Sequence, residues 1–127
     1  WGNEGDDLLN GEAGNDILIG GNGADDLTGG NGSDIFKFFS PSEGRDTIRD
    51  FQHGTDKLQF AMAGFSQSVN FVSSSNPVAS NSTPAFLYNT TTGVLSYDSN
   101  GNSWFGLDEL VTLVGRPTLT ASDLLLV

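Results

Sequence analysis

Cysteine is absent from this sequence, and basic residues are scarce, with five Lys and Arg against sixteen Asp and Glu. Without cysteine no disulfide can cross-link the fold, so an extracellular protein of this composition needs another cross-link, such as a bound metal. The net charge of −11 argues against a nucleic-acid partner, because a polyanion binds a basic face. No apolar run reaches the roughly 18 residues that a membrane-spanning helix needs.

Motifs for catalysis are also absent. The single histidine, His53, has no Ser or Asp partner that the sequence identifies, so an ordinary surface histidine is the better interpretation. The sequence contains neither the H-E-x-x-H zinc motif nor the G-x-S-x-G nucleophile elbow. Glycine pairs such as Gly21 and Gly23 lack the Lys-Ser/Thr and the helix of a phosphate-binding loop. We therefore predict no catalytic residue in this chain.

Glycine, by contrast, is abundant, with 17 residues among 127. A hydrophobic fraction of 36% leaves little material for a large core. Residues 1–36 hold eight acidic residues and no Lys or Arg. Without cations this stretch repels itself, so we expect its folding to be coupled to metal binding.

A nine-residue pattern runs four times through residues 2–37. Its conserved columns are a glycine in the first position, a glycine in the fourth, an Asp in the sixth and an apolar residue in the eighth. The members are Gly2, Gly11, Gly20 and Gly29; Gly5, Gly14, Gly23 and Gly32; Asp7, Asp16, Asp25 and Asp34; and Leu9, Leu18, Leu27 and Phe36. Glycines three residues apart mark a tight turn, and the short segment that follows can form a strand with its central side chain facing inward.

Two such units complete a coil of 18 residues. Repeats one and three then stack on one edge, and repeats two and four on the other. Successive turns direct backbone carbonyls and an Asp carboxylate into the gap between them, and an all-oxygen cage favours Ca²⁺ over Mg²⁺. We predict that Asp7 shares an ion with Asp25, and Asp16 with Asp34. A solvated turn surface without ions is the alternative.

The pattern matches G-G-x-G-x-D-x-U-x, the Ca²⁺-binding nonapeptide of RTX proteins, and the segment resembles the parallel β-roll of RTX proteins exported by type I secretion. In that family the earlier turn usually gives its second and fourth carbonyls, and the later turn its first and third. The resemblance implies one ion among Asn3, Gly5, Asp7, Gly20, Asn22 and Asp25, and a second among Glu12, Gly14, Asp16, Gly29, Asn31 and Asp34. Asn3 and Glu12 stand where the pattern has its second glycine, a position that needs only a carbonyl.

Beyond Lys37 the repeat decays. Residues 44–48 and 54–58 still read G-x-D-x-U, and we interpret them as two degenerate turns that close the roll. Residues 46–60 also resemble the segment that follows the repeats in serralysin-type proteases. Asp46 would cap a site begun by Gly21, Gly23 and Asp25, and Asp56 a site begun by Gly30, Gly32 and Asp34. Ordinary Asp residues in surface turns are the alternative, so we predict two to four Ca²⁺ ions.

We expect an all-β fold, in which a parallel β-roll is followed by an antiparallel C-terminal region. The roll would span residues 1–60, with regular repeats at 2–37 and degenerate turns at 44–60. A cap and a Ser/Asn-rich loop would follow at 61–84, and the antiparallel region at 85–127. A plug over the end of the roll, or an aromatic ligand pocket, would be formed by Phe36, Phe38, Phe39, Phe51, Phe60 and Phe65.

Past this plug the sequence predicts further strands. One short strand is expected near residues 69–72, a hairpin at 85–97 with its turn at Gly93, a second turn at 98–102 and an apolar element at 107–114. A short helical turn is expected at 120–123. The chain ends in Asp123 followed by Leu124, Leu125, Leu126 and Val127. This terminus resembles the uncleaved C-terminal signal of type I secretion substrates, although a final strand docked in a sheet would look the same.

Two functions follow as hypotheses. The first is a Ca²⁺-binding C-terminal module of a longer secreted bacterial protein, whose upstream part could be an enzyme, since the chain opens within a repeat. It would pass unfolded through a type I ABC exporter and fold outside, where Ca²⁺ reaches the roughly 10⁻⁴–10⁻³ M that extracellular sites need. The second is a Ca²⁺-dependent module that binds polysaccharide or a cell surface through its polar surface and Trp104.

Overall fold

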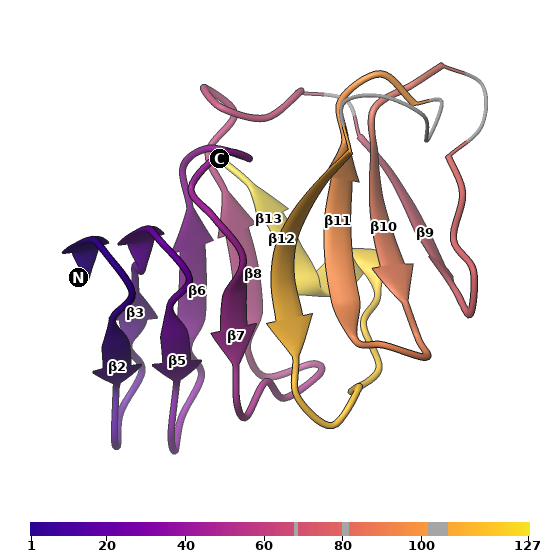
Figure 1. Cartoon of the computed structure of the whole chain (residues 1–127). Helices are drawn as coiled ribbons and strands as arrows, with labels where there is room; N and C mark the ends of the chain where they lie inside the picture. The colour runs from indigo at the N-terminus through magenta and orange to yellow at the C-terminus, as the bar shows by residue number, and fades with distance from the viewer. Residues whose placement is uncertain (68, 80–81, 102–106) are drawn as a thin grey trace.

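The computed structural model describes residues 1–67, 69–79, 82–101 and 107–127. Within these segments the chain is built of strands, and the only helical element is the 3₁₀ turn η1 at Ala121–Asp123. In the same segments no helix is long and apolar enough to cross a membrane. Figure 1 shows the short strands near the N-terminus leading into longer strands of the C-terminal region. The all-β fold expected from the sequence is confirmed.

The N-terminal strands stack in two parallel ladders. Leu9 lies opposite Leu27, and Leu18 opposite Phe36, so the coil repeats at the predicted interval of 18 residues. The next coil continues the same stack. The first ladder contains β2 (Leu8–Asn10), β5 (Asp26–Thr28) and β7 (Asp46–Ile48), the second contains β3 (Ile17–Leu18), β6 (Ile35–Phe38) and β8 (Lys57–Phe60), and β1 (Asn3–Glu4) pairs with β4 (Gly21–Asn22) in the turns. The predicted parallel β-roll is confirmed.

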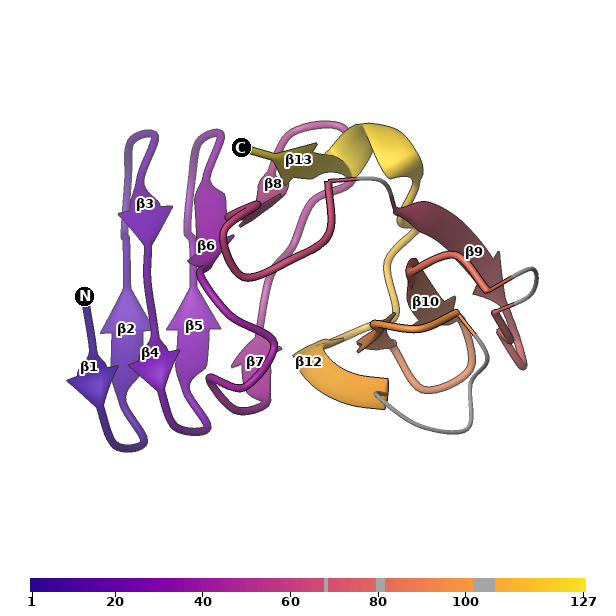
Figure 2. The same ribbon diagram turned by 90° about the horizontal axis from the view of Figure 1, so that it is seen from above.

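The two ladders run alongside each other in the view from above (Figure 2), and their inward side chains form a thin core between them. Each regular repeat contributes one apolar side chain to this space, because alternate residues of a strand face opposite sides of the sheet. Leu27 and Phe36 are fully buried, whereas Leu8 and Ile17 face outward and are exposed. The roll therefore gains little from apolar burial per residue.

The C-terminal region continues both sheets of the roll. Strand β12 (Leu107–Leu113) pairs in parallel with β7, and β13 (Leu124–Leu126) pairs in parallel with β8. One sheet therefore has seven strands in the order β2-β5-β7-β12-β11-β10-β9, and the other has four in the order β13-β8-β6-β3. The longer sheet crosses the boundaries proposed at residues 60/61 and 84/85, so the division into separate units stays a prediction.

The rest of the C-terminal sheet is a hairpin with one added strand. Strands β10 (Ala85–Asn89) and β11 (Val94–Asp98) are antiparallel, and Gly93 in their turn has a φ of 77°. Strand β9 (Asn70–Ser74) lies within the Ser/Asn-rich segment and pairs in parallel with β10. Trp104 and Asn102, which the sequence placed on a surface and in a turn, lie outside the described residues.

Aromatic side chains fill the space between the roll and the C-terminal sheet. The ring centroid of Phe60 lies 4.5 Å from that of Phe86, and the centroid of Phe65 lies 5.1 Å from that of Tyr97. Among the six phenylalanines predicted to form the plug, Phe39 is the exception, because it is only partly buried and stacks on Trp1. Phe39 directly follows Phe38, the last residue of β6, so the alternation that turns Phe36 and Phe38 inward turns Phe39 to the other side.

Candidate metal sites

The Asp residues of successive turns are joined by hydrogen bonds. On one edge of the roll, the N–H of Asp7 donates to Oδ1 of Asp25 at 2.8 Å. On the other edge, the N–H of Asp16 donates to Oδ1 of Asp34 at 2.9 Å. The structure therefore brings together the two Asp pairs that the 18-residue interval predicted.

The same hydrogen bonds between Asp residues continue into both degenerate turns. The N–H of Asp25 donates to Oδ1 of Asp46 at 3.1 Å, and the N–H of Asp34 donates to Oδ1 of Asp56 at 3.0 Å. These pairs are separated by 21 and 22 residues, because the connecting loops are longer than in the regular repeats. The widened spacing thus leaves the stacking of the turns intact.

The second carboxylate oxygen of each regular Asp has no hydrogen-bond partner. Oδ2 of Asp7, Asp16, Asp25 and Asp34 is buried and unpaired among the described residues. Burying a carboxylate oxygen without a donor is costly, so such an atom in a native fold needs an explanation. A cation in the gap between turns would supply the missing partner.

Backbone carbonyls of the later turn point back toward the earlier one. The N–H of Gly5 donates to the carbonyl of Asn22 at 2.8 Å. The carbonyl oxygen of Gly20 would lie 2.5 Å from a Cβ placed on Gly2. The carbonyls of the first and third positions of the later turn therefore face the gap; their role as ligands stays a prediction.

Carbonyls of the earlier turn point forward in the same way. A Cβ placed on Gly21 would collide with the carbonyl of Asn3, and one on Gly23 would collide with the carbonyl of Gly5. Both glycines have a positive φ, of 99° and 141°, which side chains rarely tolerate. Glycine is required here because the turns approach each other too closely for any side chain.

The other edge repeats this geometry one unit later along the chain. The N–H of Gly14 donates to the carbonyl of Asn31 at 2.8 Å. The remaining carbonyls that face the gap are those of Glu12, Gly14 and Gly29, which lie against Gly30, Gly32 and Gly11. Glu12, like Asn3, keeps a positive φ, of 72° and 80° respectively. The two departures from the glycine pattern therefore preserve the turn.

The donor set at each regular gap is two carboxylates and several carbonyls. Among the described residues no three His, Asp or Glu side chains converge, so the backbone would have to supply the remaining ligands. An all-oxygen, partly charged and irregular set suits Ca²⁺, which accepts six to eight oxygen ligands in flexible geometry. The residues present fit this ion.

Asp46 and its turn complete a third gap above Asp25. Burial, followed by the nearby charges of Asp25 and Glu43, raises the pKa of Asp46 to about 7. The N–H of Gly23 donates to the carbonyl of Glu43 at 2.7 Å, and a Cβ on Gly44 would collide with the carbonyl of Gly23. Sequence reasoning missed Glu43, although it precedes Gly44 just as Asn22 precedes Gly23.

Asp56 sits in a different environment. Its Oδ1 accepts the N–H of Asp34 and its Oδ2 accepts the N–H of Gln52 at 2.8 Å, so both oxygens have backbone partners. The N–H groups of Gly29 and Gly30 donate to the carboxylate of Asp50 at 2.9 and 2.8 Å. On this edge, side-chain carboxylates therefore accept the last backbone N–H groups of the stacked turns. Nothing in the repeat pattern identified Asp50 beforehand.

Asp123 joins the end of the chain to the last turn. Its carboxylate accepts the N–H groups of Gly54 at 3.0 Å and Thr120 at 2.9 Å, and Oδ2 lies 2.6 Å from Nδ1 of His53. Burial favours the neutral acid, but these hydrogen bonds outweigh it and lower the pKa of Asp123. The apolar residues that follow form β13, so the docked-strand interpretation describes the structure, and the export role of this segment stays a prediction.

Comparison with known protein families gives a match over most of the chain. The model of the family described as peptidase M10 serralysin C terminal matches residues 6–126. No curated protein matches the chain. The matched residues include the regular repeats from residue 6 onward, the degenerate turns and the C-terminal strands.

Proposed function

Because the chain belongs to the serralysin C-terminal family of the M10 peptidases, we propose that it is an RTX calcium module that folds on binding Ca²⁺ after export. Members of this family form a non-catalytic region of metalloproteases, and they occur in secreted bacterial proteins. Binding of Ca²⁺ is known for this family.

One observation carries the proposal: the Oδ2 atoms of Asp7, Asp16, Asp25 and Asp34 are buried and find no hydrogen-bond partner in the described part of the chain. Each lies at a gap that backbone carbonyls also face. In the absence of a cation these carboxylates repel each other and lack donors, which opposes stacking of the turns. A divalent ion reverses both effects, so metal binding and folding become one event.

We propose three ions. Two would occupy the regular gaps at Asp7/Asp25 and Asp16/Asp34, and the third the gap between Asp25 and Asp46. We assign no ion to Asp56, because both of its oxygens accept backbone N–H groups. Asp25 would then contribute to two sites on one edge.

Circular dichroism of the 127-residue chain, titrated with Ca²⁺ and in parallel with Mg²⁺, tests this function. We expect a cooperative gain of β signal with Ca²⁺ alone, because each ion joins two turns that cannot stack separately. Calorimetry of the same titration should give about three ions per chain. A chain equally ordered in chelating buffer, or equally ordered by Mg²⁺, would contradict the proposal.

The export role requires a separate test, because β13 is both the predicted signal and part of a sheet. Deletion of residues 124–127 should abolish secretion through a type I ABC exporter. The double variant Asp25→Asn/Asp34→Asn keeps the tail and should still leave the cell, yet should fail to fold outside. Equal secretion of the deletion and the intact chain would refute a role for this segment.

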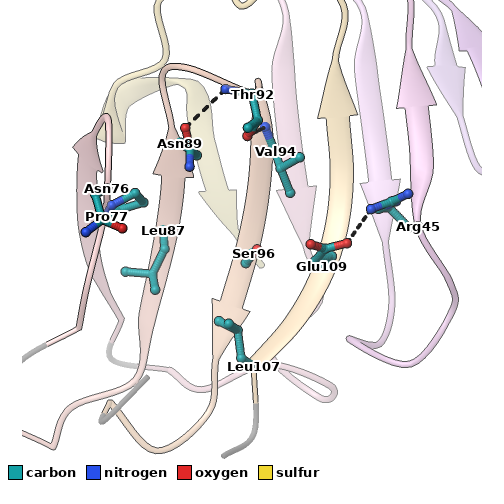
Figure 3. Close-up of a pocket in the computed structure, with 10 residues that line it drawn as sticks. All are labelled: Arg45, Asn76, Pro77, Leu87, Asn89, Thr92, Val94, Ser96, Leu107 and Glu109. Carbon is teal, nitrogen blue, oxygen red and sulfur yellow. Dashed lines mark hydrogen bonds and ion pairs between the residues drawn. The ribbon is translucent and has the colours of Figure 1, made fainter. Parts of the chain in front are cut away.

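A second candidate function is Ca²⁺-dependent binding of polysaccharide or a cell surface. The observation that favours it is a groove of about 420 Å³ on the outer face of the C-terminal sheet (Figure 3). This volume lies in the range of small-molecule sites.

A further inference from the structure

The groove crosses the outer face of β10, β11 and β12 (Figure 3). The apolar residues Leu87, Val94 and Leu107 line it, together with the hydroxyl residue Ser96. Asn76 and Pro77 stand at one side, and Arg45 and Glu109 form an ion pair at the other. We propose that this groove binds a neutral, polyhydroxylated saccharide, and that calcium controls binding through the turn that carries Arg45.

Recognition in this groove falls to side chains. Strands β10 and β11 have hydrogen-bonded neighbours on both sides, and β12 pairs with β11 on one side and with β7 at residues 111–113 on the other. An extended peptide gains most of its affinity by pairing with a free sheet edge, whereas Leu87, Val94 and Ser96 of the groove lie on the inner strands β10 and β11. The ligand must therefore be one that side-chain donors and acceptors can recognise.

The polar groups of the groove match the hydroxyl groups of a sugar. Oδ1 of Asn89 accepts the N–H groups of Thr91 and Thr92 at 2.9 and 3.1 Å, which fixes the amide, and its NH₂ donates to none of the described residues. At the opposite side the guanidinium of Arg45 provides donors and the carboxylate of Glu109 provides acceptors. Sugar hydroxyls both donate and accept, so they can use this alternation, while the apolar side chains contact C–H groups.

Charge selects a neutral ligand. Arg45 and Glu109 neutralise each other, so the groove itself has no excess charge. The whole molecule carries −11, which repels polyanions such as uronic-acid polymers. A cationic ligand would have to break the ion pair in order to reach Glu109.

Arg45 also connects the groove to the third candidate calcium site. It lies between Gly44, which packs against the carbonyl of Gly23, and Asp46, whose Oδ1 accepts the N–H of Asp25. An ion between Asp25 and Asp46 would fix this turn against the stack and thereby hold Arg45 beside Glu109 on β12. This link rests on the proposed calcium function, whereas the ligand class rests on the groove alone.

Calorimetric titration of the 127-residue chain with cellohexaose and maltohexaose, in millimolar Ca²⁺, tests the inference. We expect at least one of these neutral hexasaccharides to bind, and Arg45→Ala to weaken binding at least about tenfold, because a charged donor is lost. Arg49→Ala is the matched control. Arg49 forms a similar exposed ion pair with Asp26 but does not line the groove, so its loss should leave binding unchanged.

Two further variants test occupancy of the groove and the link to calcium. Ser96→Phe should abolish saccharide binding by filling the groove, while circular dichroism should show an unaltered calcium transition. Asp46→Asn should weaken saccharide binding more than Asp7→Asn, since only Asp46 adjoins Arg45. Equal effects of these two Asp variants would overturn the calcium link.

The outcomes separate the inference from the function beneath it. Normal calcium-dependent folding without binding of either hexasaccharide would overturn the inference and leave the calcium function standing. Preferential binding of an alginate hexamer or of an unstructured neutral peptide would also overturn it. Absence of any calcium-dependent folding would instead refute the proposed function.

Discussion

The roll and the C-terminal strands share one seven-stranded sheet, but the two regions are held together in different ways. Each regular repeat of the roll contributes one inward apolar residue, such as Leu27. Its acidic turn places an Asp Oδ2 atom where no described residue donates a hydrogen bond to it. The C-terminal strands instead enclose an aromatic cluster in which Phe60, Phe86 and Tyr97 are buried. Under the proposed function the roll needs the counter-charge of bound Ca²⁺ in order to stack, whereas apolar burial contributes much more to the stability of the C-terminal region.

Removing calcium should expose this contrast most strongly. In a chelator we expect the amides of residues 1–37 to lose protection against hydrogen exchange almost completely, because stacked carboxylates then repel each other. The hairpin of β10 and β11 should keep most of its protection. Hydrogen exchange read by mass spectrometry provides both measurements, and uniform loss across the chain would remove the distinction between the regions.

Within the roll, Asp25 should matter more than Asp7. Asp25 accepts a hydrogen bond from one turn and donates one to the next, whereas Asp7 lies at the first turn only. We expect Asp25→Asn to raise the Ca²⁺ concentration at the folding midpoint by about tenfold, because fewer charged ligands weaken an oxygen cage. Asp7→Asn should raise it clearly less. Similar midpoints in calcium titrations of the two variants would count against a shared role for Asp25.

Glycine substitutions separate close approach from backbone strain. Gly23→Ala should destabilise the calcium-bound chain by about 3 kcal/mol, since it combines positive φ with a collision against the Gly5 carbonyl. Gly5→Ala has a positive φ of 103° but open space around the added Cβ, and should cost about 1 kcal/mol. Urea denaturation in saturating Ca²⁺ measures both values. A larger loss for Gly5→Ala would mean that the turns do not pack as closely as described.

The pH dependence should change sign with calcium. The pKa of Asp46 is raised to about 7 from 3.8, and burial also raises the pKa values of Asp56 and Glu43. The calcium-free fold therefore binds these protons more tightly than the unfolded chain, so stability present at acidic pH is lost as the pH rises through about 7. With calcium, carboxylates must be ionised, and stability should rise with pH.

Circular dichroism at about pH 5 and about pH 7.5 checks this reversal. In chelator we expect the β signal of the chain to be modestly greater at the lower pH. Asp46→Asn should reduce the difference, because Asn does not titrate. A calcium-free signal that grew toward higher pH would show that these acids do not lie together.

Local periodicity accounts for what could be predicted. The interval of 18 residues placed Asp7 beside Asp25, and the G-x-D-x-U remnants located the turns of Asp46 and Asp56. Contacts between distant segments could not be predicted in this way. The parallel pairing of β12 with β7 joins residues 65 positions apart, such as Thr47 and Thr112. The contact of Asp123 with His53 joins residues 70 positions apart, and neither pair shares a sequence pattern.

Asp50 is a residue of the candidate site that sequence periodicity could not predict either. It accepts the N–H groups of Gly29 and Gly30 where a further turn would have offered carbonyls. A single surface Asp outside the repeat gives no sign of that task in the sequence. Phe39 is the corresponding case in the core. Its aromatic side chain led us to predict that it belongs to the plug, whereas the alternation of β6 turns it outward, where it stacks on Trp1.

The register of the roll also determines how its length can change by duplication. Leu9 and Leu27, like Leu18 and Phe36, are partners separated by a whole coil. Duplicating the gene segment that encodes one whole coil would therefore insert a new layer of the roll, and every later side chain would stay on the same face of its sheet. Duplicating a single nine-residue unit would exchange the two edges and present β7 and β8 to the wrong C-terminal strands. Length variants of this module should accordingly differ by even numbers of repeats.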